Sequence, residues 1–207
     1  MSCKNQNFDY IIKKNDTLPS ILYKISNCEN IDLNQNNLII KANMWANSSL
    51  ANAISSTETN IKLKNNYNIS AASVEDYILI KKHNYFEYLK VESISDDDIY
   101  VSRGQLSSTP RNWGKYTQIK IIKIVDVECE KEITYNEAIN LNGEKENIVS
   151  QQNLIYNWFA GDTSNPGEYF LEFEVTKNNG GITEWTKKFP SEKEGIKIQI
   201  IDNNLEI

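Results

Sequence analysis

Few residues of this 207-residue chain could do acid–base, nucleophilic or metal chemistry, and they are scattered. The single histidine, His83, follows two lysines in a polar stretch that predicts a turn. One histidine without neighbouring cysteines cannot hold zinc on its own, and no serine or cysteine is spaced to pair with it as a nucleophile. The sequence therefore nominates no catalytic and no metal-binding residue. We expect a protein that is not an enzyme and needs no cofactor.

Two groups of acidic residues have simple structural explanations. The run Asp96–Asp98 lacks the alternating spacing and the closing glutamate of a calcium loop, so we interpret it as the solvated tip of a hairpin. Glu172 and Glu174 lie two residues apart. A glycosidase needs two carboxylates on opposite sides of a cleft, and the sequence alone does not exclude that. Polar residues that alternate with apolar ones along a strand explain the pair fully.

Aromatic and arginine side chains gather in the middle of the chain. Such rings could stack on a sugar, although cores and protein interfaces use them more often. The aromatic members are Tyr85, Phe86, Tyr88, Trp113 and Tyr116, and both arginines of the chain lie nearby. The candidate partner-interface residues are Tyr85, Phe86, Arg103, Arg111 and Trp113.

Composition limits the possible partners. Hydrophobic residues make up 40% of the chain and charged residues 24%, which is ordinary for a globular protein. The net charge of −6 makes a nucleic acid an unfavourable partner. No apolar run of membrane-spanning length occurs, and the first residues lack the apolar core of a signal peptide. Three cysteines without metal or redox spacing (Cys3, Cys28 and Cys129) predict reduced thiols.

The clearest strands lie between residues 156 and 190. Apolar residues fall on every second position from Tyr169 to Val175, which predicts a half-buried strand. A dense turn signal at 161–167 precedes it, and Asn178–Gly181 predicts a tight hairpin after it. Tyr169 stands two residues before the core position Leu171. That placing resembles the tyrosine corner of an immunoglobulin-like sandwich.

The rest of the chain also predicts strands. They are expected at 8–14, 18–25, 37–44, 61–63, 78–81, 85–94, 99–102, 117–124, 153–159 and 196–200, with weak strands at 125–127 and 132–135. Residues 45–57 predict an excursion between strands, and 137–143 predict a helical turn or a loop. The closely spaced strands of residues 59–123 indicate a small closed barrel. We therefore expect an all-β protein, an immunoglobulin-like β-sandwich of residues 1–58 and 124–207 with a small β-barrel inserted at 59–123.

One segment resembles the N-terminal domain of upper baseplate proteins from phages and related contractile-tail particles. That family shows a tryptophan, then Gly-Asp-Thr, Pro-Gly and a Tyr-x-x-Glu-Phe strand. The matching residues here are Trp158, Gly161, Asp162, Pro166, Gly167 and Tyr169. Residues 13–19 (KKNDTLP) are similar to the opening of the family, with Asn15 in place of a glycine, and Phe189-Pro190 also fits. The resemblance covers roughly residues 8–58 and 124–202.

A second segment resembles a small barrel of phage tail and fibre proteins. Its matches are residues 74–80, 87–91 and 99–105, together with Thr109 and Gly114. Glu75 stands where the barrel usually has glycine, and Trp113 stands near its usual histidine.

The two resemblances imply a structural part of a virion. The chain would be an adaptor in the tail baseplate of a phage or of a phage tail-like bacteriocin. There it would attach tail fibres or receptor-binding proteins within a multi-copy ring, without a nucleic-acid or membrane partner. Tails assemble in the host cytoplasm, which fits the missing signal peptide. Because longer relatives continue past the sandwich, we expect that this chain does not grip the host itself. The alternatives are a carbohydrate-binding module that uses the middle aromatics and an enzyme such as a wall hydrolase.

Overall fold

Thirteen β-strands and no helix make up the regular structure of the residues described here. The computed structural model describes residues 10–26, 29, 31–64, 70–191 and 195–202. The expectation of an all-β protein is therefore confirmed for this part of the chain. The start of the strand predicted at Phe8 and the thiols of Cys3 and Cys28 lie outside the described residues.

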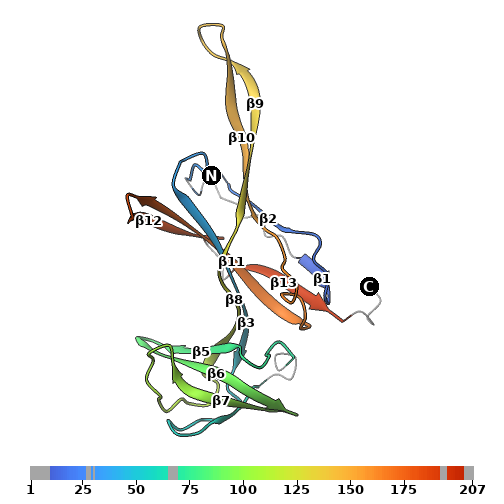
Figure 1. Cartoon of the computed structure of the whole chain (residues 1–207), viewed down its shortest axis with the longest axis vertical. Helices are drawn as coiled ribbons and strands as arrows, with labels where there is room; N and C mark the ends of the chain where they lie inside the picture. The colour runs from blue at the N-terminus through green and yellow to red at the C-terminus, as the bar shows by residue number, and fades with distance from the viewer. Residues whose placement is uncertain (1–9, 27–28, 30, 65–69, 192–194, 203–207) are drawn as a thin grey trace.

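The strands form one long sheet and one short sheet. In the long sheet the order is β1 (Tyr10–Lys13), β13 (Ile196–Ile201), β11 (Gly167–Asn179), β3 (Leu38–Ser49), β8 (Gln118–Glu128), β5 (Tyr77–Lys82), β6 (Tyr85–Ser95), β7 (Asp98–Gln105) and β4 (Asn60–Lys62), and β12 (Ile182–Phe189) pairs with β11. In the short sheet the order is β2 (Ile21–Lys24), β10 (Lys145–Tyr156) and β9 (Glu130–Ile139). Figure 1 shows an elongated molecule with β5–β7 at one end and the β9–β10 hairpin at the other.

The two sheets share a core that β11 organises. Its alternating residues Tyr169, Leu171, Phe173 and Val175 are fully buried, as the period of two predicts. Tyr23 of β2 crosses from the short sheet and packs on Phe173, with ring centroids 6.4 Å apart. Burying rings of this size supplies a large share of the apolar contact that holds two sheets together.

Distant parts of the chain lie side by side in the long sheet. Ile40 and Ala42 of β3 stand opposite Val175 and Phe173 of β11. β1 runs parallel to β13, with Ile12 opposite Ile200. The residues around Ile12 and Ile40 thus belong to the same buried cluster as Leu171 and Phe173, as the sequence predicted.

β3 and β8 are longer than the sequence predicted. The excursion expected at residues 45–57 is wrong for residues 45–49, because β3 continues through the buried Trp45 and Ala46 to Ser49. The expected separate strand at 125–127 is also wrong, since β8 runs without interruption from Gln118 to Glu128. The two strands pair along their length, with irregular register around Met44.

Residues 59–123, here called the middle module, continue the pairing beyond β3 and β8. After β8, the neighbouring strands in the sheet are β5, β6, β7 and β4, in that order. β4 then approaches the chain just after β3, where Leu50 forms a bridge with Leu63 and the Ala51 amide donates to the Lys62 carbonyl at 2.7 Å. The chain of paired strands therefore returns to the end of β3.

The β9–β10 hairpin corrects a second group of expectations. Residues 137–143 predicted a helical turn or a loop, but β9 extends to Ile139, and β10 begins at Lys145 rather than near residue 153. The outer part of the hairpin extends away from the shared core (Figure 1), and most of the hairpin's side chains are exposed. A strand with both faces in water needs no apolar alternation, so its sequence carries a weak pattern. We call its outer part, residues 134–151, the arm.

Candidate functional site

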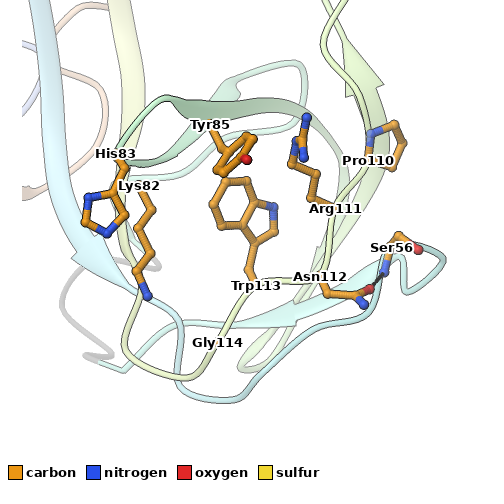
Figure 2. Close-up of a pocket in the computed structure, with 9 residues that line it drawn as sticks. All are labelled: Ser56, Lys82, His83, Tyr85, Pro110, Arg111, Asn112, Trp113 and Gly114. Carbon is orange, nitrogen blue, oxygen red and sulfur yellow. Dashed lines mark hydrogen bonds between the residues drawn. The ribbon is translucent and has the colours of Figure 1, made fainter.

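An open pocket of about 730 Å³ lies in the middle module. It is formed by the turn between β5 and β6, the loop before β8 and one residue from the loop after β3 (Figure 2). Its lining residues are Ser56, Lys82, His83, Tyr85, Pro110, Arg111, Asn112, Trp113 and Gly114. None of these described lining residues is acidic, so Lys82 and Arg111 give the pocket a positive charge.

Beneath the pocket lies a buried carboxylate, Glu87, which bonds to the lining residue Trp113. Glu87 of β6 has no exposed surface, and it accepts hydrogen bonds from the Trp113 indole at 2.6 Å and from Arg103 Nε and Nη2 at 2.7 and 2.9 Å. The backbone amides of Gly104 and Arg111 donate to it as well. A buried charge is tolerated when it is paired and hydrogen-bonded in this way.

Arg103 uses its whole guanidinium group within this network. Besides Glu87, it donates to the carbonyls of Ser55, Glu58 and Arg111 at 2.7–2.8 Å. Five N–H groups are all that a guanidinium offers. Arg103 therefore ties the loops after β3 and β7 to β6 and holds the pocket walls in place.

The hydrogen bonds also set the charge of Glu87. Burial alone would raise the pKa of this carboxyl, but the donors of Arg103 and Trp113 outweigh it and lower the pKa below its usual value of 4.5. Glu87 is therefore an anion at neutral pH, and the Glu87–Arg103 pair carries no net charge into the pocket.

The rim of the pocket carries the groups that a partner can reach. Tyr85 is 55% exposed, and the Arg111 guanidinium lies over its ring at 4.3 Å. Figure 2 shows Lys82 and His83 on one side of Tyr85, and Arg111 with Asn112 on the other. The Ser56 amide donates to Asn112 Oδ1 at 2.7 Å and fixes that side. The rim thus offers an aromatic surface between two cations, which suits an anionic and partly apolar partner.

The five predicted interface residues separate into two groups. Tyr85, Phe86 and Arg111 are exposed, although Phe86 does not line the pocket and packs edge-on against Tyr88. Arg103 and Trp113 are buried, with 6% of the Arg103 side chain and 5% of Trp113 exposed. These two position the site from below and do not offer a contact surface.

Sequence reasoning did not nominate Lys82, His83 or Glu87 for this site. Glu87 had one usable signal, because it falls in phase with the buried Leu89 and Val91 on β6. An acid on the apolar side of a strand predicts a buried partner such as arginine. Lys82 and His83 carry no signal beyond a polar turn.

The motif residues between Trp158 and Tyr169 contact the opening segment, residues 13–19. The Trp158 indole donates to the Pro19 carbonyl at 2.9 Å, and Thr163 Oγ1 donates to the Asp16 carbonyl at 2.7 Å. Asp162 accepts from the Tyr156 hydroxyl and the Phe159 amide at 2.6 and 2.7 Å. Side chains of the later segment are therefore tied to backbone carbonyls of the opening segment.

The turn at Gly161 to Gly167 is built from these motif residues. Gly161 adopts a φ of 101°, which favours glycine. A Cβ at position 167 would lie 3.3 Å from the Tyr169 ring, so glycine gives that ring its place. The Tyr169 hydroxyl donates back to the Asn165 carbonyl at 2.9 Å, and the Pro166 carbonyl accepts from Ser70 at 3.0 Å.

Other chemistry has little support in the described part of the chain. Within it, no three His, Cys, Asp or Glu side chains group closely enough to hold a metal ion. Burial and the neighbouring Glu130 raise the pKa of the Cys129 thiol to about 12, so this thiol is protonated at neutral pH. Among the described residues no helix is long and apolar enough to cross a membrane.

A comparison of the sequence with models of known protein families and with curated proteins found no match.

Proposed function

We propose that this protein is a structural adaptor in the tail baseplate of a phage or phage tail-like particle, where it attaches tail fibres or receptor-binding proteins. The main support is the meeting of the two segments that resemble upper baseplate proteins. Residues 13–19 and 158–169 lie far apart in the sequence, yet Trp158 bonds to Pro19 and Thr163 to Asp16. If the two segments belong to one structural motif, they should contact each other in the folded protein, as they do through these bonds.

Two departures from the family patterns also support the proposal. Asn15 and Glu75 stand where the two resemblances expect glycine, and both adopt positive φ angles, of 64° and 78°. Glycine is the usual residue in this backbone region. The backbone thus keeps the conformation for which the related patterns use glycine, although the side chain has changed.

For the fold we propose an immunoglobulin-like sandwich, residues 1–58 and 124–207, with a small barrel inserted at 59–123. The bond from the Tyr169 hydroxyl to upstream backbone is the one that a tyrosine corner makes. The bridge between Leu50 and Leu63 brings the last strand of the middle module back to the first, as barrel closure requires. Tyr85, Phe86 and Arg111 would then serve as a docking surface of the barrel.

The direct test is to find the chain in particles. Tails are purified from the strain that encodes it, and the chain is located by mass spectrometry and by gold-labelled antibody. We expect it at the baseplate in several copies, and we expect that particles made without its gene lack fibres. Absence from purified tails, with the chain left in the soluble fraction, would contradict the proposal.

The structure weakens the carbohydrate-binding alternative, because the main ring proposed to stack on a sugar is not accessible. Trp113 is buried with its indole bonded to Glu87, so it cannot present a stacking face. Tyr85 is exposed, but Arg111 covers one face of its ring. A glycan array tests what is left of this alternative: sugar binding that Tyr85→Ala abolishes would favour it over the adaptor.

A further inference from the structure

The two ends of the molecule carry surfaces of opposite charge. The middle module contains ten lysines and arginines against seven acidic residues, a net charge of +3, whereas the whole chain has a net charge of −6. The arm contains three glutamates and one lysine, a net charge of −2. Lys145 of the arm pairs with Glu137 at 3.1 Å, which leaves Glu144 and Glu146 as its uncompensated charges.

The arm is also apolar at its tip. Leu141 is fully exposed in the turn, Ile139 is 74% exposed and Ile148 is 49% exposed. The turn itself is ordered, because Asn140 Oδ1 accepts the amides of Asn142 and Glu144 at 3.0 Å. An ordered tip with exposed aliphatic side chains beside carboxylates is suited to enter a pocket rather than to stay in water.

The pocket of the middle module has the matching properties. Its rim offers the Tyr85 ring between Lys82 and Arg111, and no described lining residue is acidic. No described residue forms an ion pair with Lys82, Arg111 or Glu146. A volume of about 730 Å³ leaves room for a leucine side chain and its neighbours.

These surfaces cannot meet within one chain. The arm leaves the molecule at one end and β5–β7 form the other end (Figure 1). We propose that the arm tip of one copy docks in the pocket of a second copy, with Leu141 against the Tyr85 ring and Glu144 and Glu146 near Lys82 and Arg111. Such a contact joins two different patches, so repetition gives a closed ring or an open chain. This contact rests on the proposed function, because it supplies the multi-copy assembly that a baseplate adaptor needs.

Sedimentation of the full-length protein tests the contact. We expect species larger than a monomer that grow with protein concentration and shrink at high salt, since salt screens the charges. Two double variants, E144K/E146K at the tip and K82E/R111E in the pocket, should each abolish association. The chain that carries all four changes restores opposite charges and should associate again. K13E/K14E, which reverses two charges on and after β1, is the matched control and should associate like the wild type.

A mixing experiment separates this contact from pairing of two arms. In one variant Asn-Gly joins Tyr135 directly to Val149, which removes the tip at a pair of opposite residues. Mixed with K82E/R111E, this variant supplies an intact pocket and its partner supplies an intact tip. We expect heterodimers that grow no further. Circular dichroism melting shows that each variant is folded.

Two results would overturn the inference. One is a wild-type protein that stays monomeric at every concentration, and the other is a mixture of the two variants that forms no heterodimer. The proposed function is judged separately: a monomeric chain that still sediments with purified tails refutes only the head-to-tail contact. A self-associating chain that is absent from tails refutes only the adaptor role.

Discussion

Glu87 holds a charge inside the middle module because five donors surround it. The same network fixes three loop carbonyls through Arg103 and leaves the pocket rim to other residues. The stability of the pocket and the binding by its rim can therefore be changed separately. Substitutions at Glu87 act on folding, whereas substitutions at Lys82 act on association.

Glu87→Gln should destabilise the protein strongly. The amide cannot neutralise Arg103, and removing one partner of a buried ion pair costs about 3–5 kcal/mol. The free energy of unfolding, measured by urea denaturation, gives this difference. Glu92→Gln on the same strand is the matched control, because Glu92 is exposed and accepts only from Ser102. Equal small effects of the two variants would show that the Glu87 network contributes little.

The same carboxyl makes stability depend on pH. The folded state lowers the pKa of Glu87 below 4.5, so its contribution is complete above that pH and is lost as the pH falls through the folded pKa. The stability difference between wild type and Glu87→Gln should therefore be constant near neutrality and shrink as the pH falls below 4.5. Denaturation curves of both proteins across this range measure it. A difference that grows on acidification would mean that the pKa shift has the opposite sign.

Glu75 offers a test of the glycine-like backbone. At a φ of 78°, the Cβ of a residue with a side chain is crowded by the backbone, whereas glycine has no Cβ and avoids this strain. Glu75→Gly relieves this strain, but it gives the unfolded chain more freedom and removes the exposed ion pair with Lys90. The net change should lie between neutral and about 1 kcal/mol of stabilisation. Glu92→Gly, within β6, should destabilise instead by about 0.5–1 kcal/mol. If both variants lose stability equally, the backbone at Glu75 is not strained.

At the scale of elements, the arm differs from every other strand pair. A two-stranded ribbon has little stability of its own in water. The arm is tied to the loop after β2 near its base, where the Tyr135 hydroxyl donates to Asn34 Oδ1 at 3.2 Å. The Tyr135–Val149 pair and the ordered turn are its main internal supports. No residue of the buried core lies in the arm tip, so we expect the tip to be available for association.

Removal of the arm tip should leave folding intact. With Asn-Gly between Tyr135 and Val149, no residue of the shared core is lost. Stability should change by no more than about 0.5 kcal/mol, as for surface substitutions. In the wild type, amides of the arm should exchange hydrogen faster than those of β11. A large loss of stability in the shortened protein, or slow exchange in the arm of a monomer, would contradict this view.

The elements also show which features a sequence makes visible. β11 was predictable because one face is buried and the other is wet, so its residues alternate. The extension of β3 through Trp45 was not, because three consecutive residues there are buried and the period of two is lost. The pocket could be predicted only in part. Tyr85 and Arg111 are notable by residue type, whereas Lys82 is brought beside Tyr85 by the pairing of β5 with β6.

At the scale of the whole molecule, β3 and β8 pass through both halves. Asn47 stands opposite Lys120 and Ala46 opposite Ile121, so β3, which leads toward the middle module, and β8, which leads out of it, lie side by side. A second link lies between the loop at residues 70–73 and the turn before β11, where Asn165 Nδ2 donates to Ser73 Oγ at 2.7 Å. The middle module is thus joined to the rest by one strand pair, a few hydrogen bonds and apolar packing, since buried residues such as Ala71 belong to the same cluster as Tyr169.

This arrangement predicts that residues 46–121 fold alone. The fragment keeps the paired strands, the bridge between Leu50 and Leu63 and the Glu87–Arg103 network. Trp113 is its only tryptophan, so fluorescence reports burial directly. We expect cooperative unfolding at a lower temperature than in the full chain, because the bonds to Asn165 and Pro166 are lost. Glu87→Gln should destabilise the fragment by about as much as it destabilises the whole protein. An unfolded fragment with an exposed Trp113 would show that the two halves are one cooperative domain, and the insertion would then have to be abandoned.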